Sequence, residues 1–372
     1  MTVKIKLKKQ LFLIIRKIGR LFWGKNVWLV SDREMFAGDN GEAFFKYIQN
    51  KPVKSYFAIS KASKDYDRIC SIGKVVDYGS LLYKFMLCVV DAHISSQTLH
   101  MENHEETYQI FLQHGVAGTD LSSFLNEVCH NNFYMITSSA DEKKSFEGES
   151  YIIQEKKVWL TGLPRHDLLY SKPSKKITIS LTWRKYLLDM DIDMFKESLY
   201  FKIYNTLLND SELIDILENY GYKLCFKLHP EMGRYKDVFV MNEKVEVWDT
   251  SYTEIFAQSD LLVTDYSSIA FDFAILRKPV IYYQFDEDVF WQGKHNCTKG
   301  YFDYRRDGFG EVVEKHDELR ELIISYVEAK CAIKSEYVER IDKFFAYHDQ
   351  NNSERVYEKI VELLGRRYVV SE

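Results

Sequence analysis

Two histidines occupy positions where predicted strands end, and their side chains could take part in proton transfer or phosphate binding. His114 lies in FLQHG, near the end of a strand predicted over residues 108–115, and Gly115 follows it. His229 lies in KLCFKLHP, two residues after Lys227 at the end of a second predicted strand. A histidine with a pKa of about 6.5 can remove a hydroxyl proton at neutral pH or donate a hydrogen bond to a phosphate oxygen. Each position alone also fits a capping or packing role.

The segment TDYSS marks a candidate anion site. An apolar strand predicted over 260–265 runs into it, and a helix predicted from Ser267 follows. Ser267 or Ser268 can cap that helix, whose free backbone N–H groups and dipole attract a phosphate. In the alternative interpretation, the two serines only cap the helix and Asp265 only braces the turn. The segment by itself favours neither interpretation.

Arg184 and an acidic run near it are the remaining candidates. Arg184 follows the strand predicted over 177–183, so we expect its guanidinium to form a two-point contact with phosphate oxygens. The run DMDID at 189–193 superficially resembles a D-x-D cation site, but no strand precedes it. We interpret it as a solvated acidic surface and predict no metal site. The absence of G-x-G-x-x-G, P-loop and G-x-S-x-G motifs argues against NAD chemistry, Walker-type ATP hydrolysis and α/β-hydrolase activity.

The segments that position these residues alternate between short apolar runs and amphipathic stretches. This alternation over 27–167 and over 177–285 is typical of βα units that build parallel sheets. A chain of 372 residues suits two domains, and the proline-containing segment 170–176 is the expected crossing. We predict a GT-B-like α/β fold with two doubly wound, Rossmann-like domains facing across a cleft. The expected domains cover 26–172 and 173–372, the second including the terminal helices, with ligands beyond the carboxyl ends of the strands.

Residues 1–25 form a separate feature, a predicted basic amphipathic helix. They include eight Lys or Arg residues and no acidic residue, although the chain carries a net charge of −5. At 100° per residue, one face gathers six apolar side chains, those of Leu11, Ile14, Ile15, Ile18, Leu21 and Phe22. The opposite face gathers Lys9, Arg16, Lys17 and Arg20. Such a helix can lie in the headgroup layer of an anionic membrane. The alternative is that its apolar face packs on the protein's own core.

Composition narrows the class of protein. A content of 46% hydrophobic and 28% charged residues predicts compact globular domains rather than disorder. The net charge of −5 argues against nucleic-acid binding, which requires a basic surplus. The six cysteines are scattered without a C-x-x-C pair, so we expect reduced thiols. No apolar run approaches the ~20 residues that span a bilayer, and no signal peptide is predicted, so we expect a cytoplasmic location.

Eight segments, taken in order along the chain, resemble the CDP-glycerol glycerophosphotransferase family, which includes the teichoic-acid primases and polymerases. They are WLVSDREMFAGDNGEAFFKYI (28–48), ISSQ (94–97), LQHGV (112–116), TGLPRHD (161–167), TWR (182–184), KLHP (227–230), TDYSSIAFDFAILRKPVIYY (264–283) and GYFDY (300–304). The resemblance covers nearly the whole chain, so it is far more specific than any single motif.

The resemblance implies a peripheral enzyme on the cytoplasmic face of the membrane. Its donor would be CDP-glycerol or CDP-ribitol, and its acceptor a hydroxyl of a lipid-linked teichoic-acid or capsular polymer, with release of CMP. His114, in the acceptor-side N-terminal domain, would be the base. His229, in the nucleotide-side domain, would hold the donor pyrophosphate. Arg184, Ser267 and Ser268 would assist it, Asp265 would orient their loop, and Lys227 and Gly115 would complete the substrate-binding residues.

Several alternatives stay open at this point. The donor polyol, the acceptor, the oligomeric state and a requirement for Mg²⁺ are not determined by these motifs, and no cofactor other than the donor substrate is implied. A GT-B glycosyltransferase that uses a nucleotide sugar would share the architecture. In a second alternative, the chain is a non-catalytic membrane-associated scaffold whose histidines are structural.

Overall fold

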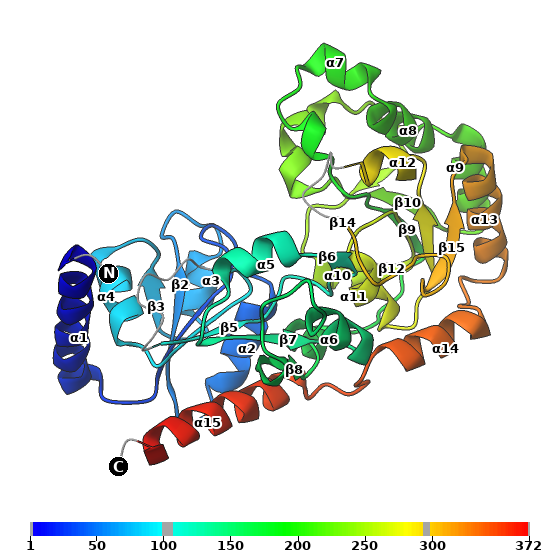
Figure 1. The fold of residues 1–372 in the computed structure, drawn as a ribbon. Helices are drawn as coiled ribbons and strands as arrows, with labels where there is room; N and C mark the ends of the chain where they lie inside the picture. The colour runs from blue at the N-terminus through cyan, green and yellow to red at the C-terminus, as the bar shows by residue number, and fades with distance from the viewer. Residues whose placement is uncertain (1–2, 99–106, 293–297, 371–372) are drawn as a thin grey trace. The chain divides into compact units, whose positions relative to one another are not determined.

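The computed structural model describes residues 3–98, 107–292 and 298–370, with side-chain surroundings given from residue 10 to residue 365 within these ranges. The chain divides into two compact units (Figure 1). Unit 1 comprises Met1–Val116, Ser122–Leu168 and Phe345–Glu372, and unit 2 comprises Ala117–Leu121 and Leu169–Phe344. Each unit is built on its own parallel sheet, which confirms the predicted class of two doubly wound α/β folds.

The sheet of unit 1 has seven parallel strands in the order β3-β2-β1-β4-β5-β7-β8. The strands are β1 (Val27–Ser31), β2 (Lys54–Ile59), β3 (Val75–Asp77), β4 (Ala92–Ser95), β5 (Tyr108–Phe111), β7 (Phe133–Thr137) and β8 (Val158–Leu160). Every residue of β1 is buried, because helices cover both faces of such a sheet. The strand order reverses between β1 and β4, and ligands of open α/β sheets bind at this kind of switch point.

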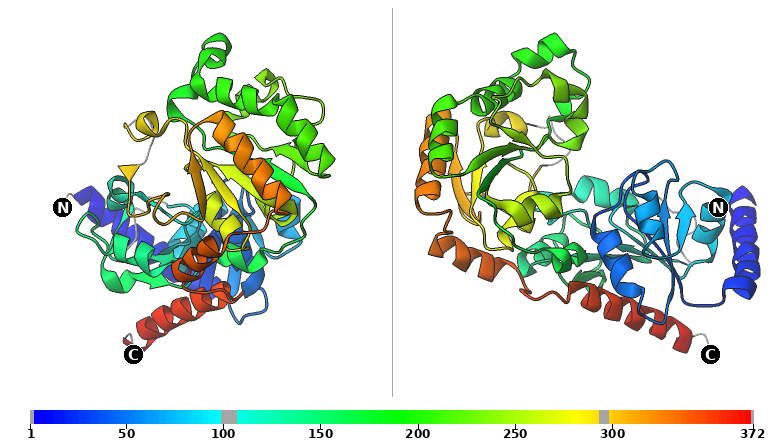
Figure 2. Two further views of the ribbon diagram at one scale, coloured as in Figure 1. Left: turned by 90° about the vertical axis from the view of Figure 1, so that its right-hand side faces the viewer. Right: turned by 180° about the vertical axis from the view of Figure 1, so that it is seen from behind.

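The helices of unit 1 include the last helix of the chain. They are α1 (Val3–Trp23), α2 (Asn40–Ile48), α3 (Tyr66–Cys70), α4 (Leu81–Val89), α5 (Ser122–Val128), α6 (Ala140–Phe146) and α15 (Asn352–Val370), with 3₁₀ turns η1 (Glu155–Lys157) and η2 (Pro164–Leu168). Helix α15 lies against α2 and η2 (Figure 2). The Asp167 carboxylate accepts the backbone N–H groups of Asn352 and Ser353 at 2.9 and 2.7 Å. This arrangement differs from the sequence expectation, in which the terminal helices all belonged to the second domain.

The sheet of unit 2 has six parallel strands in the order β11-β10-β9-β12-β13-β15, with the switch point between β9 and β12. The strands are β9 (Lys176–Ile179), β10 (Lys223–Phe226), β11 (Glu246–Val247), β12 (Ser259–Thr264), β13 (Val280–Tyr283) and β15 (Gly310–Val313). A separate antiparallel pair joins β6 (Thr119–Asp120) to β14 (Thr298–Lys299). The sequence did not predict β15, a four-residue strand that pairs with β13 through Gly310 opposite Val280.

The helices of unit 2 flank this sheet. They are α7 (Ile192–Glu197), α8 (Leu199–Leu208), α9 (Ser211–Asn219), α10 (Tyr252–Gln258), α11 (Ile269–Ala274), α12 (Glu287–Phe290), α13 (His316–Glu328) and α14 (Ser335–Phe344), with η3 (Lys185–Leu187) and η4 (Pro230–Val238). Helix α11 begins two residues later than predicted and has six residues. Two strands also end earlier than predicted: β5 stops at Phe111 and β10 at Phe226. The polar residues after each strand are therefore in loops.

Helix α1 forms as predicted, but its orientation differs from the prediction for two basic residues. Arg16 is 3% exposed and donates to the Val90 carbonyl at 3.1 Å. Arg20 forms an ion pair with the buried Asp91 at 2.5 Å. Both arginines therefore face the protein instead of belonging to a free basic surface, because the Asp91 charge lies beneath them.

The apolar stripe of α1 consequently points away from unit 1. Leu11, Ile14, Leu21 and Phe22 are 58%, 54%, 84% and 79% exposed. The contact side instead places Gly19 against Val89 of α4, where an added Cβ would lie 2.3 Å from a valine methyl carbon. Most of the predicted apolar stripe therefore does not pack on the core of unit 1, whereas Phe12 and Trp23 of the same helix do contact it. No helix in the described part of the chain has the length and apolarity needed to cross a bilayer.

Candidate functional site

Each unit holds one group of candidate functional residues. In unit 1, His114 lies in a loop after β5 whose backbone turns at Gln113 with φ 56°, a left-handed conformation that is costly for a residue with a Cβ. The Gln113 side chain is buried and donates to the Ile136 carbonyl at 2.6 Å and to Glu142 at 3.1 Å. These contacts hold the strained turn in place. His114 itself is exposed, and Gly115 is buried.

Two side chains from other segments fix the same loop. Arg165, in η2, donates from Nη1 to the His114 carbonyl at 2.8 Å and to Asp39 Oδ1 at 2.7 Å. Asn40 donates from Nδ2 to the carbonyls of Leu112 and Gln113 at 3.1 and 2.9 Å. Its Oδ1 accepts the Arg165 backbone N–H at 3.0 Å. The segments AGDNG, LQHG and GLPRHD therefore meet in one hydrogen-bond network.

At the start of α2, carboxylates of the protein itself accept the free backbone N–H groups. Asp32 Oδ1 accepts the Gly41 N–H at 2.8 Å, and Oδ2 accepts the N–H groups of Asp39 and Glu42, each at 3.1 Å. A Cβ at position 41 would lie 2.4 Å from Asp32 Oδ1, so only glycine fits there. Burial, and then the charge of Asp39, raise the pKa of Asp32 to about 7. We therefore assign Asp32 and Gly41 to the scaffold beneath the His114 loop.

The pKa of His114 is lowered from its ordinary value. The largest cause is desolvation by surrounding atoms, although the residue keeps an exposed surface. The charges of Arg33 and Arg165 lower the pKa further, whereas Asp39 and a hydrogen bond with the Ser96 backbone raise it. At neutral pH the ring is therefore neutral, and one of its nitrogens carries a lone pair that can accept a proton.

In unit 2, Arg184 lies at the centre of a buried charged cluster. Its side chain is 1% exposed and forms a two-point ion pair with Asp286, at 2.8 Å from Nε and 2.9 Å from Nη2. Nη2 also donates to Asp265 at 2.8 Å, and Nη1 donates to the Thr182 carbonyl at 2.6 Å. Burial alone would lower the pKa of Arg184, but Asp265 and Asp286 raise it. The arginine is therefore charged at every working pH.

These contacts change the role expected for Arg184. The sequence predicted a two-point contact with phosphate, whereas the structure directs the guanidinium to two carboxylates and a carbonyl. The aromatic rings of Phe290 and Tyr266 lie 4.8 and 5.3 Å from the guanidinium carbon. The physical reason is that the side chain points into the packed interior, where a buried cation needs counter-charges. Arg184 holds the loop that contains Asp265.

Asp265 joins its own loop, after β12, to the loop after β9. Its Oδ1 accepts the Thr182 N–H, the Thr182 hydroxyl and the Tyr266 N–H, each at 2.7 Å. Ser267 Oγ accepts the Ile269 N–H at 3.4 Å, whereas Ser268 makes no side-chain capping bond. Asp265 therefore orients the loop, and both serines lie half-buried at its end.

Lys227 and His229 follow β10. Lys227 Nζ donates to the carbonyls of Thr250 and Trp248 at 3.0 and 3.4 Å, so it braces the neighbouring segment. His229 Nδ1 accepts the Glu231 N–H at 3.2 Å, which leaves Nε2 to carry the proton of the neutral ring. The ring lies 6.2 Å from that of Trp183. In the neutral ring the donating nitrogen is therefore Nε2.

The structure places the predicted residues of unit 2 in loops after neighbouring strands, namely β9, β10 and β12. Asp286, which follows β13, was not predicted, nor were Asp39, Asn40 and Arg165 as parts of the His114 loop. The position of Asp286 directly after the alternating segment 177–285 was an available signal that the sequence analysis did not use. Contacts between segments about 125 residues apart, such as Arg165 with Asp39, give no local signal.

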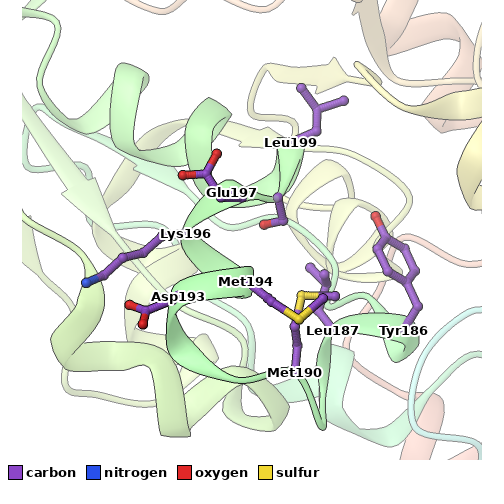
Figure 3. A pocket seen from close by; sticks show the side chains of 9 residues that line it. Tyr186, Leu187, Met190, Asp193, Met194, Lys196, Glu197 and Leu199 are labelled. Atoms are coloured by element: carbon purple, nitrogen blue, oxygen red, sulfur yellow. The ribbon is translucent and has the colours of Figure 1, made fainter.

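A pocket of about 610 Å³ lies elsewhere in unit 2, between η3 and the α7–α8 pair (Figure 3). Met190, Met194 and Leu187 point toward one another at its base, and Tyr186 forms one side. Part of the acidic run DMDID lines this pocket, and Asp191 caps α7 by accepting the Met194 N–H at 2.9 Å. Across the described ranges, no group of three or more His, Cys, Asp or Glu side chains is arranged to hold a metal ion.

Residues 13–362 match the sequence model of a family described as CDP-glycerol:poly(glycerophosphate) glycerophosphotransferase. The minor teichoic acid biosynthesis protein GgaB of Bacillus subtilis is 37% identical over 376 residues, covering 94% of this chain and 41% of that protein. The ribitol-phosphate polymerase TarL of Staphylococcus aureus is 23% identical, with 91% of this chain and 63% of TarL covered. The chain thus spans less than two thirds of the length of these relatives.

Solved structures share the fold. The wall teichoic acid polymerase TagF aligns over 99% of both chains with a TM-score of 0.69 and 16% identity. A UDP-GlcNAc 2-epimerase from Neisseria meningitidis aligns over 90% of this chain and 99% of its own, with a TM-score of 0.55 and 14% identity. At these identities the likeness concerns the GT-B-like fold alone.

Proposed function

This chain belongs to the CDP-glycerol:poly(glycerophosphate) glycerophosphotransferase family, and on that premise we propose that it transfers a polyol phosphate from a CDP-polyol to a polymer. The donor is CDP-glycerol or CDP-ribitol, and the acceptor is a hydroxyl of a lipid-linked teichoic-acid or capsular polymer. The acceptor oxygen attacks the β-phosphorus, the bond from that phosphorus to the bridging oxygen of CMP breaks, and a phosphodiester forms. The hydroxyl proton passes to His114.

The observation that carries this proposal is the state of His114. Its backbone carbonyl after β5 accepts a hydrogen bond from Arg165 at 2.8 Å, and desolvation lowers its pKa below the ordinary value. A neutral, oriented imidazole at the carboxyl end of a parallel strand is suited to remove a hydroxyl proton at neutral pH. General-base action of this kind contributes roughly 10²–10⁴-fold to the rate.

Binding of the donor falls to unit 2. Phosphoryl transfer depends mainly on positioning and on neutralising charge, so hydrogen-bond donors near the phosphates carry most of the work. We assign His229 Nε2–H and the loop of Ser267 and Ser268 to the donor pyrophosphate. Arg184 stabilises this loop through its ion pair with Asp265, and Lys227 braces the segment beside His229.

We also propose that α1 binds the cytoplasmic face of an anionic membrane. The support is the outward stripe of Leu11, Ile14, Leu21 and Phe22, on a segment that carries basic residues and no acidic ones. A lipid surface can cover such a stripe, and each exposed basic residue near anionic lipid adds about 1 kcal/mol. This orientation would keep the enzyme beside a lipid-linked acceptor.

The test is release of CMP from cytidine-labelled CDP-glycerol, with CDP-ribitol and UDP-glucose in parallel. Purified protein is mixed with a lipid-linked glycerol-phosphate primer. We expect acceptor-dependent CMP from one of the two CDP-polyols. Turnover of UDP-glucose to UDP would instead establish the glycosyltransferase alternative. Absence of both turnover and donor binding by calorimetry would leave the non-catalytic scaffold.

A further inference from the structure

The loop that carries His114 has an unusual source of rigidity. A non-glycine residue with positive φ persists only where its surroundings over-determine it, and such residues concentrate at functional sites. Gln113 has φ 56°, and the side chains of Asn40, Gln113 and Arg165 form five hydrogen bonds that hold this loop. Hydrogen bonds to the carbonyls of Leu112, Gln113 and His114 fix three successive peptide groups.

Arg165 differs from Asn40 and Gln113 because its side chain carries a charge next to His114. Its Nη1 lies 2.8 Å from the His114 carbonyl oxygen and 2.7 Å from Asp39 Oδ1. The Arg165 side chain is 17% exposed and that of Asp39 is 23% exposed, so water screens the pair only in part. One nitrogen therefore links the loop of His114 to a carboxylate at the start of α2.

The segment around Arg165 is itself anchored. Asp167 binds the start of α15 through the N–H groups of Asn352 and Ser353. Gly162 has φ 77°, and an added Cβ there would lie 1.9 Å from Asn352 Oδ1. Arg355, on α15, donates to the Thr161 carbonyl at 3.0 Å. The position of Arg165 is therefore set by α15 on one side and by Asn40 on the other.

We propose that Arg165 and Asp39 form a positioning pair for His114, which holds its backbone and sets opposite electrostatic influences on its ring. This inference rests on the proposed function, because it assigns the pair to the base of that reaction. We assign neither residue a contact with the substrate. Arg165 and Asp39 are positioning residues, and their effect on the reaction passes through His114.

The pair predicts the direction in which two substitutions shift the pKa of His114, whereas a merely structural role predicts no such direction. The charged groups around the His114 ring are Asp39 before α2, Arg33 after β1 and Arg165 in η2. Removing the positive charge with Arg165→Gln raises the pKa of His114, because its repulsion of the imidazolium is lost. Removing the negative charge with Asp39→Asn lowers the pKa of His114, because its attraction is lost.

The experiment follows the ring directly on the full chain. Histidine labelled with ¹³C at Cε1 is titrated by NMR, and the His114 signal is assigned by its absence in His114→Gln. We expect the His114 pKa to move up in Arg165→Gln and down in Asp39→Asn, and kcat to fall by about 10- to 100-fold in each through loss of positioning. Arg165→Lys keeps the charge, so it should restore the wild-type pKa and part of kcat. Affinity for CDP-glycerol stays unchanged throughout.

The control is Arg277→Gln, which removes an exposed arginine paired with Asp342 in unit 2. It should leave the His114 pKa and kcat at their wild-type values. The proposal would be overturned if Arg165→Gln and Asp39→Asn left the His114 pKa unchanged or shifted it in the same direction. It would also be overturned if Arg165→Gln kept the wild-type kcat. If that variant does not fold, Asp39→Asn decides by itself: the His114 pKa must fall in it, whereas Arg165→Lys, which keeps the charge, must leave that pKa unchanged. The titration needs no turnover, so absence of CMP release in the wild type would refute the proposed function and leave the pair testable.

Discussion

Arg184 and Asp286 are 102 residues apart in sequence, yet they form a two-point ion pair with Nε–Oδ2 and Nη2–Oδ1 distances of 2.8 and 2.9 Å. Both side chains are at most 2% exposed. The same guanidinium reaches Asp265, which binds the Thr182 backbone. The loops after β9, β12 and β13 are thus joined by one cation.

Substitution of Asp286 by Asn should disorder this junction. Loss of one partner of a buried ion pair typically costs about 3–5 kcal/mol, although Asp265 remains to neutralise Arg184 here, so we expect about 3 kcal/mol. Urea denaturation measures the free energy of unfolding. Asp342→Asn, which breaks the exposed pair with Arg277, should cost at most about 1 kcal/mol. Equal effects of the two substitutions would contradict the role assigned to the cluster.

Substitution of His114 by Ala should abolish turnover and spare donor binding. Loss of the general base predicts a decrease in kcat of roughly 10²–10⁴-fold, whereas calorimetry should give the wild-type affinity for CDP-glycerol. His130→Gln is a matched control in unit 1, where His130 contacts the Gln109 side chain at 3.0 Å. An unaltered rate in His114→Ala would remove His114 from the mechanism.

The two nitrogens of His229 can be tested separately. Asparagine can replace Nδ1 as acceptor from the Glu231 N–H, whereas glutamine can place a donor near the position of Nε2. We expect His229→Asn to weaken CDP-glycerol binding by about 10- to 100-fold, since a hydrogen bond to a charged group contributes about 1.5–3 kcal/mol. His229→Gln should bind more tightly than His229→Asn. The reverse order would show that Nδ1 is the important atom.

The pH dependence of kcat/KM should reflect His114 in the free enzyme. The pKa of His114 is lowered below the ordinary histidine value of about 6.5. At every pH above about 6.5 the ring is therefore neutral and able to accept a proton. Activity should therefore be level near pH 7 and fall only at more acidic pH, as the ring gains a proton. A decline that already begins above pH 7 would contradict the lowered pKa. The profile is measured with saturating acceptor and limiting donor.

Binding of α1 to lipid should depend on its outward stripe. Leu21→Glu with Phe22→Glu places two charges where side chains are 84% and 79% exposed, so folding should be preserved. Burial of each apolar side chain contributes about 1.5–3 kcal/mol, which predicts at least a 100-fold loss of binding to anionic vesicles in flotation assays. Val240→Glu, at a position 72% exposed in unit 2, is the control. Undiminished binding of the double variant would refute membrane contact through α1.

The sequence predicted the features that depend on local pattern. Apolar runs located most strands of both sheets, and residues such as His114 and Asp265 were recognised because they follow those runs. Periodicity also showed which residues of α1 share a face. It did not show which face meets the protein, because that depends on Asp91, about 70 residues later.

The remaining features depend on long-range contacts. Arg184 lies in a motif that suggests phosphate binding, and only the packed structure reveals two carboxylates around it. Arg165 lies in the segment TGLPRHD, but its bond to the His114 carbonyl spans 51 residues, so the sequence gives no sign of it. The strand β15 was missed because only Val312 and Val313 of its four residues are large and apolar, and its pairing with β13 decides its conformation.

The position of α15 has a consequence for the order of events during translation. Unit 1 includes Phe345–Glu372, so the first sheet leaves the ribosome while the helix that covers Trp28 and anchors η2 has yet to be made. Leu169–Phe344, nearly all of unit 2, is synthesised in the interval. Unit 1 therefore keeps part of its apolar surface uncovered until α15 has been made. The loop that bears His114 gains its last support only at that moment, because Arg165 lies in the segment that α15 anchors.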